Sequence, residues 1–126
     1  MRIFRCHHKF GFQHGPFSGD YATGFRLNID LDIHPPPRLD GLLGMFGQDG
    51  FFGCVDLKAI DIWFGKSIEV LTKNKFMVTE FEIDSKNVVV GLLGTQCRFL
   101  LSKATPIRTM TVQAAVNESL LHTVTQ

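Results

Sequence analysis

The chain has 126 residues, of which 44% are hydrophobic and 20% are charged, and its formal net charge at pH 7 is +1. This length and composition predict one globular domain over residues 1–126 and exclude a disordered chain. The balanced charge gives no general attraction to phosphate backbones or anionic membranes, so nucleic acid and membranes are not expected as partners.

Cysteine content and hydropathy indicate the compartment. Cys6, Cys54 and Cys97 are widely spaced and odd in number, which favours buried free thiols in a reducing compartment over a disulfide framework. No apolar run approaches the ~20 residues of a membrane span, and the N-terminus lacks the apolar core of a signal peptide. We therefore expect a cytoplasmic protein.

The N-terminal part predicts a strand followed by a long loop. Apolar side chains from Ile3 to Phe10 indicate a strand that ends at Gly11. Glycine, proline and aromatic residues alternate over residues 11–24, which is typical of a loop. The aromatic side chains in this loop, Phe12 among them, must be covered either by the core or by a partner.

A second strand and a second loop are expected next. Apolar and polar residues alternate strictly over residues 25–33, which predicts a half-buried strand. Three consecutive prolines from Pro35 to Pro37 end it, because proline cannot continue the ladder of hydrogen bonds. Residues 39–53 are again rich in glycine and apolar side chains and predict a loop folded against the core.

The clearest helical pattern follows this loop. Asp56 is a suitable N-cap, and Leu57, Ile60 and Phe64 recur with the spacing of one helix face, which Trp63 widens. These four apolar side chains predict a helix packed on the core.

The pattern after this helix predicts a short second helical piece and a hairpin. Gly65 interrupts the helix, and Ser67 can cap the next turns. Residues 76–83 and 88–90 have strand composition, and residues 84–87 between them form a turn, which predicts a hairpin.

The C-terminal third completes the expected fold. Residues 96–101 and 107–112 predict two more strands, and residues 113–126 a short docked helix or a frayed tail. The whole pattern predicts a single α+β domain with a mostly antiparallel sheet, one principal helix and long glycine-rich loops.

Several short motifs follow one another in order along residues 1–104. They are Arg5 and His8, Gly15-Pro16-Phe17, His34 before three prolines, Asp40-Gly41, Phe52-Gly53-Cys54, Trp63-Phe64 and Gln96-Cys97-Arg98-Phe99. In this order they resemble a family of small, uncharacterised proteins of bacteriophages and prophages. The resemblance implies a phage origin, and hence the host-cell cytoplasm, but little about chemistry.

The order of elements is also similar to compact ADP-ribosyltransferase-like domains. The residues concerned are Arg5 and His8 in the first strand and Gln96 in a late strand, where those domains carry a catalytic glutamate. Gln96 lacks the carboxylate that would orient the ribose hydroxyl and stabilise an oxocarbenium ion, so this likeness supports nucleotide binding more than transfer.

The cysteines and nearby histidines are further candidate site residues. Cys6, His7, His8 and His14 form the only cluster of soft metal ligands, but His7 and His8 point to opposite faces of a strand, so no metal site is expected. Cys54 at a helix entry is a candidate nucleophile, although its apolar neighbours favour a packed, protonated thiol.

Loop and strand polar residues give the remaining candidates. His34 is a candidate general base with Asp40 as its orienting group, against the alternative of a hydrogen-bonded loop histidine. Arg26, Arg98 and Arg108 are candidates for one polar sheet face that holds a phosphate or an acidic protein surface, against the alternative of solvated strand faces.

These observations favour an accessory protein that acts by binding a host protein or a small nucleotide, and so disarms a host defence protein or sequesters its nucleotide signal. The alternatives are a small enzyme that uses a nucleotide, and a virion or assembly component. No cofactor is expected, and a homo-oligomer stays open. The candidate binding residues are Arg5, His8, His34, Asp40, Gln96, Arg26 and Arg98. We expect folded loops to bring the first four of these together.

Overall fold

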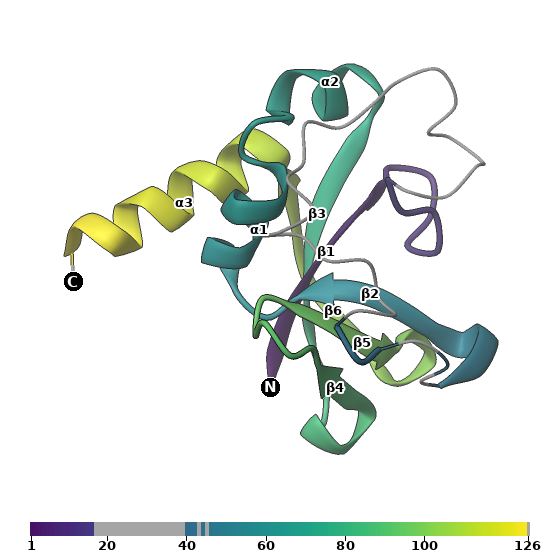
Figure 1. Ribbon diagram of the computed structural model, residues 1–126. Helices are drawn as coiled ribbons and strands as arrows, with labels where there is room; N and C mark the ends of the chain where they lie inside the picture. Colours follow the sequence, from purple (N-terminus) through teal and green to yellow (C-terminus); the bar gives the residue numbers. More distant parts are fainter. Residues whose placement is uncertain (17–39, 43, 45, 126) are drawn as a thin grey trace.

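The computed structural model describes residues 1–16, 40–42, 44 and 46–125 (Figure 1). The elements within these residues are β1 (Arg2–His8), β2 (Gly50–Cys54), α1 (Leu57–Phe64), α2 (Ile68–Lys73), β3 (Phe76–Glu82), β4 (Val88–Val90), β5 (Gln96–Leu100), β6 (Thr105–Thr111) and α3 (Val112–Thr125). The strands form one antiparallel sheet in the order β4-β5-β2-β1-β3-β6. This arrangement confirms the predicted α+β fold.

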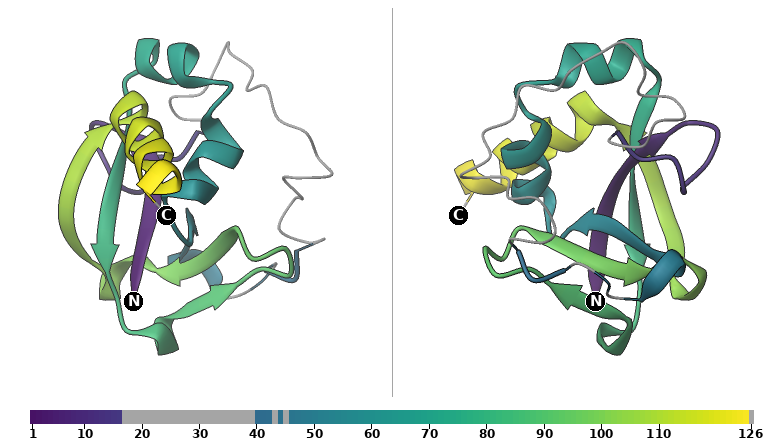
Figure 2. Two further views of the ribbon diagram at one scale, coloured as in Figure 1. Left: turned by 90° about the vertical axis from the view of Figure 1, so that its left-hand side faces the viewer. Right: turned by 45° about the vertical axis from the view of Figure 1, so that its right-hand side comes forward.

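The sheet consists of two halves that meet at one point. β1 pairs with β3 along all seven residues, and β2 pairs with β5 along all five. Between the halves, β1 and β2 pair only at Phe4 and Cys54. β2 and β5 therefore run across the direction of β1 and β3, as Figures 1 and 2 show. The two strands diverge on either side of this pair, and the space between their backbones, which we call the gap, is occupied by side chains such as Arg5.

The helices cover one face of the sheet (Figure 2). α1 presents its apolar stripe to that face, as the spacing predicted, and Trp63 and Phe64 lie in the core. Its first turn is capped by Asp56, whose Oδ1 accepts a hydrogen bond from Ala59 N at 2.8 Å. The buried residues of this core are Phe4, Cys6, Cys54, Leu57, Ala59, Ile60, Trp63, Phe64, Leu71, Phe76, Val78, Val112, Ala115 and Val116.

The opposite face of the sheet has its own core. Its buried residues are Ile3, Phe81, Ile83, Cys97 and Phe99. The chain after β1 folds back over this core. Phe12 there packs edge-on against His7 and Phe81, with ring centroids 5.0 and 5.2 Å apart. The core therefore covers this loop aromatic residue.

The expected loop over residues 39–53 is wrong at its end, because β2 begins at Gly50. The loop was predicted because glycines are common in loops. Gly53 nevertheless belongs in the strand, for a steric reason. A Cβ atom at this position would lie 3.0 Å from the carbonyl oxygen of Phe4 and 3.1 Å from the Phe99 ring. Glycine thus allows the close approach of the two sheet halves.

The predicted hairpin of residues 76–83 with 88–90 is also wrong. β3 pairs with β1 and β6, whereas β4 pairs with β5. The turn between them is a short 3-10 segment, Ser85–Asn87, in which Lys86 N donates to Asp84 Oδ1 at 3.0 Å. This turn redirects the chain to the far edge of the sheet.

The last helix is more substantial than the sequence indicated. α3 extends over 14 residues, and Val112, Ala115 and Val116 on it complete the core under α1. Its apolar stripe is weak because it carries exposed leucines as well, at Leu120 and Leu121. No helix in the described part of the chain is long and apolar enough to cross a membrane.

Replacing the cap of α1 should weaken the fold measurably. Asp56→Ala should lower the free energy of unfolding by about 1 kcal/mol, because Ala59 N loses its acceptor at the helix start. Asp56→Asn, which keeps a side-chain oxygen, should lose much less. Urea unfolding of both variants measures the difference, and equal losses would contradict this role for the cap.

Candidate functional site

The structure brings together two of the predicted site residues, Asp40 and Gln96. Gln96 Nε2 donates to Asp40 Oδ2 at 3.1 Å. Leu93 N donates to Asp40 Oδ1 at 2.9 Å, and Leu92 N donates to the Asp40 carbonyl oxygen at 3.0 Å. The Asp40 residue is only 1% exposed. This aspartate therefore fixes the turn formed by residues 91–94, which we call the leucine turn.

The leucine turn fits tightly onto Asp40. A Cβ atom at Gly91 would lie 1.9 Å from Asp40 Oδ2, so only glycine fits at this position. Gly91 N donates to the Gln96 carbonyl oxygen at 2.8 Å, and Gly94 N donates to the Gly91 carbonyl oxygen at 3.0 Å. Trp63 of α1 also reaches this region, where its Nε1 donates to Thr95 Oγ1 at 3.2 Å. The turn is thus held in one conformation by hydrogen bonds.

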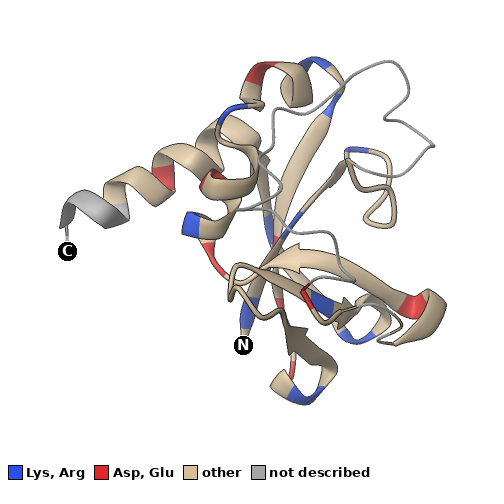
Figure 3. Cartoon of the chain, in the orientation of Figure 1, with Lys and Arg blue, Asp and Glu red and all other residues tan. Residues whose placement is uncertain are grey.

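This rigid turn presents apolar side chains to the outside. Leu92 is 82% exposed and Leu93 is 53% exposed, and Val90 at the end of β4 is 45% exposed. The sequence from Val88 to Gly94 carries no charge, whereas basic and acidic residues are interspersed over the other described helices and strands except β2 (Figure 3). The sequence pattern predicted Val90 as part of a strand and placed Leu92 and Leu93 in no element. The uncharged run was the signal that marked them.

Arg5 lies on the face of the sheet opposite the helices, in the gap between β1 and β2. Its Nε donates to the Phe12 carbonyl oxygen and its Nη1 to the Phe52 carbonyl oxygen, both at 2.6 Å. Its guanidinium also lies over the Phe51 ring, with Cζ 5.2 Å from the centroid. Arg5 is 5% exposed, and no carboxylate among the described residues forms an ion pair with it. Burial lowers the pKa of Arg5 to about 10, so it remains charged at neutral pH.

His7 lies on the same face as Arg5, two residues further along β1. Its Nε2 is 2.6 Å from Thr79 Oγ1, which is 2.7 Å from Thr109 Oγ1 on β6. Its Nδ1 is 2.8 Å from the His8 carbonyl oxygen. Burial, and then the charge of Arg5, lower the pKa of His7 below its ordinary value. His7 is therefore kept neutral inside the fold.

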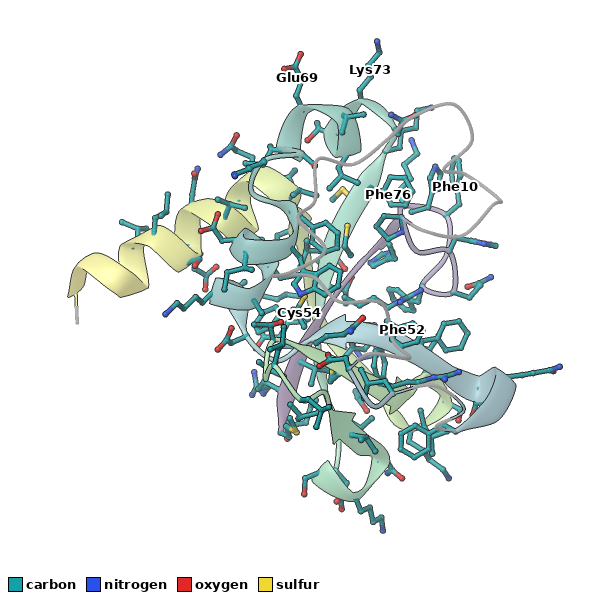
Figure 4. The ribbon with its side chains drawn as sticks, in the orientation of Figure 1. Phe10, Phe52, Cys54, Glu69, Lys73 and Phe76 are labelled. Atoms are coloured by element: carbon teal, nitrogen blue, oxygen red, sulfur yellow. The ribbon has the colours of Figure 1, made fainter. Side chains whose placement is uncertain are left out.

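His8 lies on the helix-covered face, away from Arg5. Its ring is 5.1 Å from the Phe10 ring and 5.4 Å from the Phe76 ring, between centroids. Figure 4 shows Phe10 and Phe76 beside each other at this end of β1. Burial lowers the pKa of His8 as well. The Arg5 and His8 motif thus serves two different faces of the sheet.

The expected convergence of Arg5, His8, His34 and Asp40 is not found among the described members of this set, because Arg5 and His8 lie on opposite faces of the sheet. His34 and Arg26 lie outside the described residues. Arg5 faces the core that contains Phe99, whereas Gln96 lies opposite Cys54 in the strand register and faces the helices. Arg5, His8 and Gln96 therefore do not surround a common point.

The strand arginines Arg98 and Arg108 do not gather on one sheet face either. Arg98 of β5 donates to the carbonyl oxygens of Leu42 and Gly47 at 3.1 and 2.8 Å, and lies 5.0 Å from the Phe52 ring centroid. Arg108 lies on β6, the edge strand at the end of the sheet away from β4 and β5. Its Nε is 2.6 Å from Glu80 Oε1. Each arginine has a local structural role.

The cysteines are packed rather than reactive. Cys6, Cys54 and Cys97 are all buried, and Figure 4 shows Cys54 on β2. Burial raises the pKa of Cys6 and of Cys97 to about 12 and raises the pKa of Cys54 as well. The thiol of Cys54 is therefore protonated, as its apolar neighbours predicted. Within the described ranges, no three histidine, cysteine or acidic residues are grouped to hold a metal ion.

Removing the Asp40 carboxylate should loosen the leucine turn. Asp40→Ala should lower the free energy of unfolding by about 2 kcal/mol, because Leu93 N and the Gln96 amide lose their acceptor. It should also speed hydrogen exchange at the Leu92 and Leu93 amides. Asp40→Asn, which can still accept from Leu93 N, is the matched control and should lose less. Unchanged exchange in Asp40→Ala would show that the aspartate does not fix the turn.

Stability should fall in mild acid because two buried histidines resist protonation. The unfolded chain takes up these protons below about pH 6.5, the ordinary histidine pKa, whereas the folded chain does so only at lower pH. The contribution of these two histidines to the free energy of unfolding is therefore present above about pH 6.5 and lost as the pH falls.

The variant His7→Gln tests this pH dependence. It should reduce the difference between the free energies of unfolding at pH 7.5 and pH 5.5, whatever its effect at either pH alone. His8→Gln should also reduce this difference, because it removes the second buried histidine. Urea unfolding at the two pH values measures this. A difference unchanged in both variants would refute the assignment.

Comparison with known proteins gives the family. The model of the Bacteriophage T4 Y00F protein family matches residues 1–113. No curated protein and no solved structure matches the chain. The matched region includes β1 to β6, Arg5, Asp40 and the leucine turn, and ends at the start of α3. The chain therefore belongs to the Bacteriophage T4 Y00F protein family, a family of uncharacterised phage proteins.

Proposed function

We propose that this phage protein is an accessory protein that binds a host protein through the leucine turn and the adjacent strand β4. The observation that carries this proposal is the presentation of Leu92 and Leu93. They extend into solvent from a turn that two backbone hydrogen bonds fix to the buried Asp40, which also accepts a hydrogen bond from Gln96. Exposed apolar side chains on a rigid support are typical of binding surfaces.

Rigidity is what makes this surface suited to binding. A flexible apolar loop loses conformational freedom when it docks, and this loss weakens the complex. The leucine turn has already lost that freedom in the folded protein, because Asp40 and Gln96 fix its backbone. The free energy gained by burying two leucines is then available for affinity.

Strand β4 adds a second means of attachment. Gly91 N donates to the Gln96 carbonyl oxygen across the β4 and β5 ladder, and hydrogen-bonded pairs alternate along an antiparallel pair. Val89 therefore pairs with Arg98, while Val90 directs its backbone N–H and C=O groups to the outer edge of the described sheet. The Val88 N–H is already engaged, because it donates to the Ser85 carbonyl oxygen. A partner strand can pair with the Val90 groups.

The other edge of the sheet is protected against such pairing. β6 carries Pro106, which has no N–H group, and the charged Arg108. Its register with β3 is also irregular between Glu80 and Phe81. Proline, charge and bulges are the common protections of edge strands. β4 has none of these features, which supports a role for it in binding.

A host protein is the partner that suits this surface. The chain belongs to a phage family, and an uncharged apolar edge matches an apolar groove or edge strand of another protein. A host defence protein is the class we propose, inhibited by occupation of that groove or strand. The enzyme, virion and nucleotide-sequestering alternatives stay predictions.

The leucine turn can be tested with paired substitutions. Leu92→Ser with Leu93→Ser should preserve the fold, because both side chains are exposed, and should weaken binding at least tenfold, about 1.4 kcal/mol. Leu120→Ser with Leu121→Ser on α3 is the matched control and should bind normally. The experiment first selects proteins that the wild type and the control capture from host lysate and that the Leu92 and Leu93 variant does not. These proteins are then purified, and calorimetry measures their affinity for each variant.

Strand pairing is tested separately at Val90. Val90→Pro removes an outward N–H at an edge where proline is tolerated, and should weaken the purified complex, whereas Val90→Thr should not. Equal binding by all variants would refute the docking surface. A wild-type dimer in sedimentation that Leu92→Ser with Leu93→Ser dissociates would assign the surface to a second copy of the chain instead.

A further inference from the structure

The gap between β1 and β2 holds a buried positive charge that nothing in the described chain neutralises. Arg5 is 5% exposed, and its two hydrogen-bond acceptors are the neutral carbonyl groups of Phe12 and Phe52. Two other arginines of the sheet show the contrast, although Arg98 resembles Arg5 in donating to carbonyl oxygens. Arg2 and Arg108 each form ion pairs with glutamates. A buried cation without an anion is costly, so the site favours a negative ligand.

One part of the guanidinium remains available for such a ligand. Nε and Nη1 are occupied by the two carbonyl oxygens, while Nη2 makes no hydrogen bond to the described residues. Nη2 lies beside Gly15, where a Cβ atom would come within 3.1 Å of it. Glycine at this position thus avoids the close contact that a larger side chain would make with Nη2.

The surroundings of Nη2 contain no competing acid among the described residues. The groups that interact electrostatically with Arg5 are the buried thiols of Cys6 and Cys97, which are protonated at neutral pH. His7 on the same face is neutral and already engaged with Thr79. Arg5 is therefore the dominant charge of this region.

We propose that Nη2 of Arg5 binds an oxyanion, a phosphate or carboxylate group, in the gap between β1, β2 and residues 11–16. An oxyanion accepts charge-assisted hydrogen bonds from the two N–H groups of Nη2 and neutralises the buried cation. It links the two halves of the sheet more firmly, because Arg5 contacts both. This site is independent of the leucine turn, which lies on another part of the molecule.

Anion-dependent stability tests the proposal. Thermal unfolding is measured at pH 7.5 and constant ionic strength, with chloride replaced by up to about 10 mM inorganic phosphate, acetate or adenosine monophosphate. A ligand that binds only the folded state raises the melting temperature in a saturable way. We expect this rise for at least one of the three anions. The pattern among them distinguishes a free phosphate, a carboxylate and a phosphate monoester as the source.

Two variants show whether Arg5 is responsible. Arg5→Lys keeps the positive charge without Nη2, and Gly15→Ala keeps Arg5 but crowds Nη2. Both variants should therefore lose the rise in melting temperature. Gly15→Ala remains informative if Arg5→Lys does not fold. Arg98→Lys, which alters a guanidinium on the other sheet face, should retain it. The absence of any saturable rise in the wild type, or a rise preserved in Gly15→Ala, overturns the proposal.

Discussion

The fold depends on how the two halves of its sheet are joined. Backbone pairing joins them only at Phe4 and Cys54, so side chains must supply the rest of the connection. Arg5 does so from one face, by donating to the Phe52 carbonyl oxygen while stacking on Phe51. Arg98 lies over the Phe52 ring on the other face. Two guanidinium groups thus hold β2 from opposite sides, and the helices can pack on a single bent surface.

Buried polar groups elsewhere serve the same purpose of fixing chain segments that have little secondary structure. Asp40 is the clearest case, because its carboxylate and its carbonyl group together accept three hydrogen bonds from the segment that begins with Leu92. A buried carboxylate is stable only when its oxygens are satisfied in this way. The same arrangement that stabilises the aspartate therefore also determines which side chains of the turn face outward.

The sequence predicted those features that depend on neighbouring residues. The apolar spacing and the Asp56 cap gave α1, and β-branched and aromatic residues gave β3 and β5 within a residue or two. Features that depend on distant residues were missed. β2 was read as a loop because Gly50 and Gly53 are locally typical of loops, and the need for glycine beside the Phe4 carbonyl is visible only once β1 is placed. Likewise, only the strand register shows that Arg5 and Gln96 face different sides.

The position of β1 has a consequence for how the chain reaches its native state. β1 is an interior strand, yet it precedes the other described strands in the chain, and its pairing with β3 brings Arg2 to Glu82 across 80 positions. Closing such distant contacts is slow compared with forming local ones. During synthesis at about 5–20 residues per second, the apolar side chains of β1 stay unpaired for several seconds. The nascent chain is therefore most exposed to misassociation before β3 emerges, and the final sheet forms late.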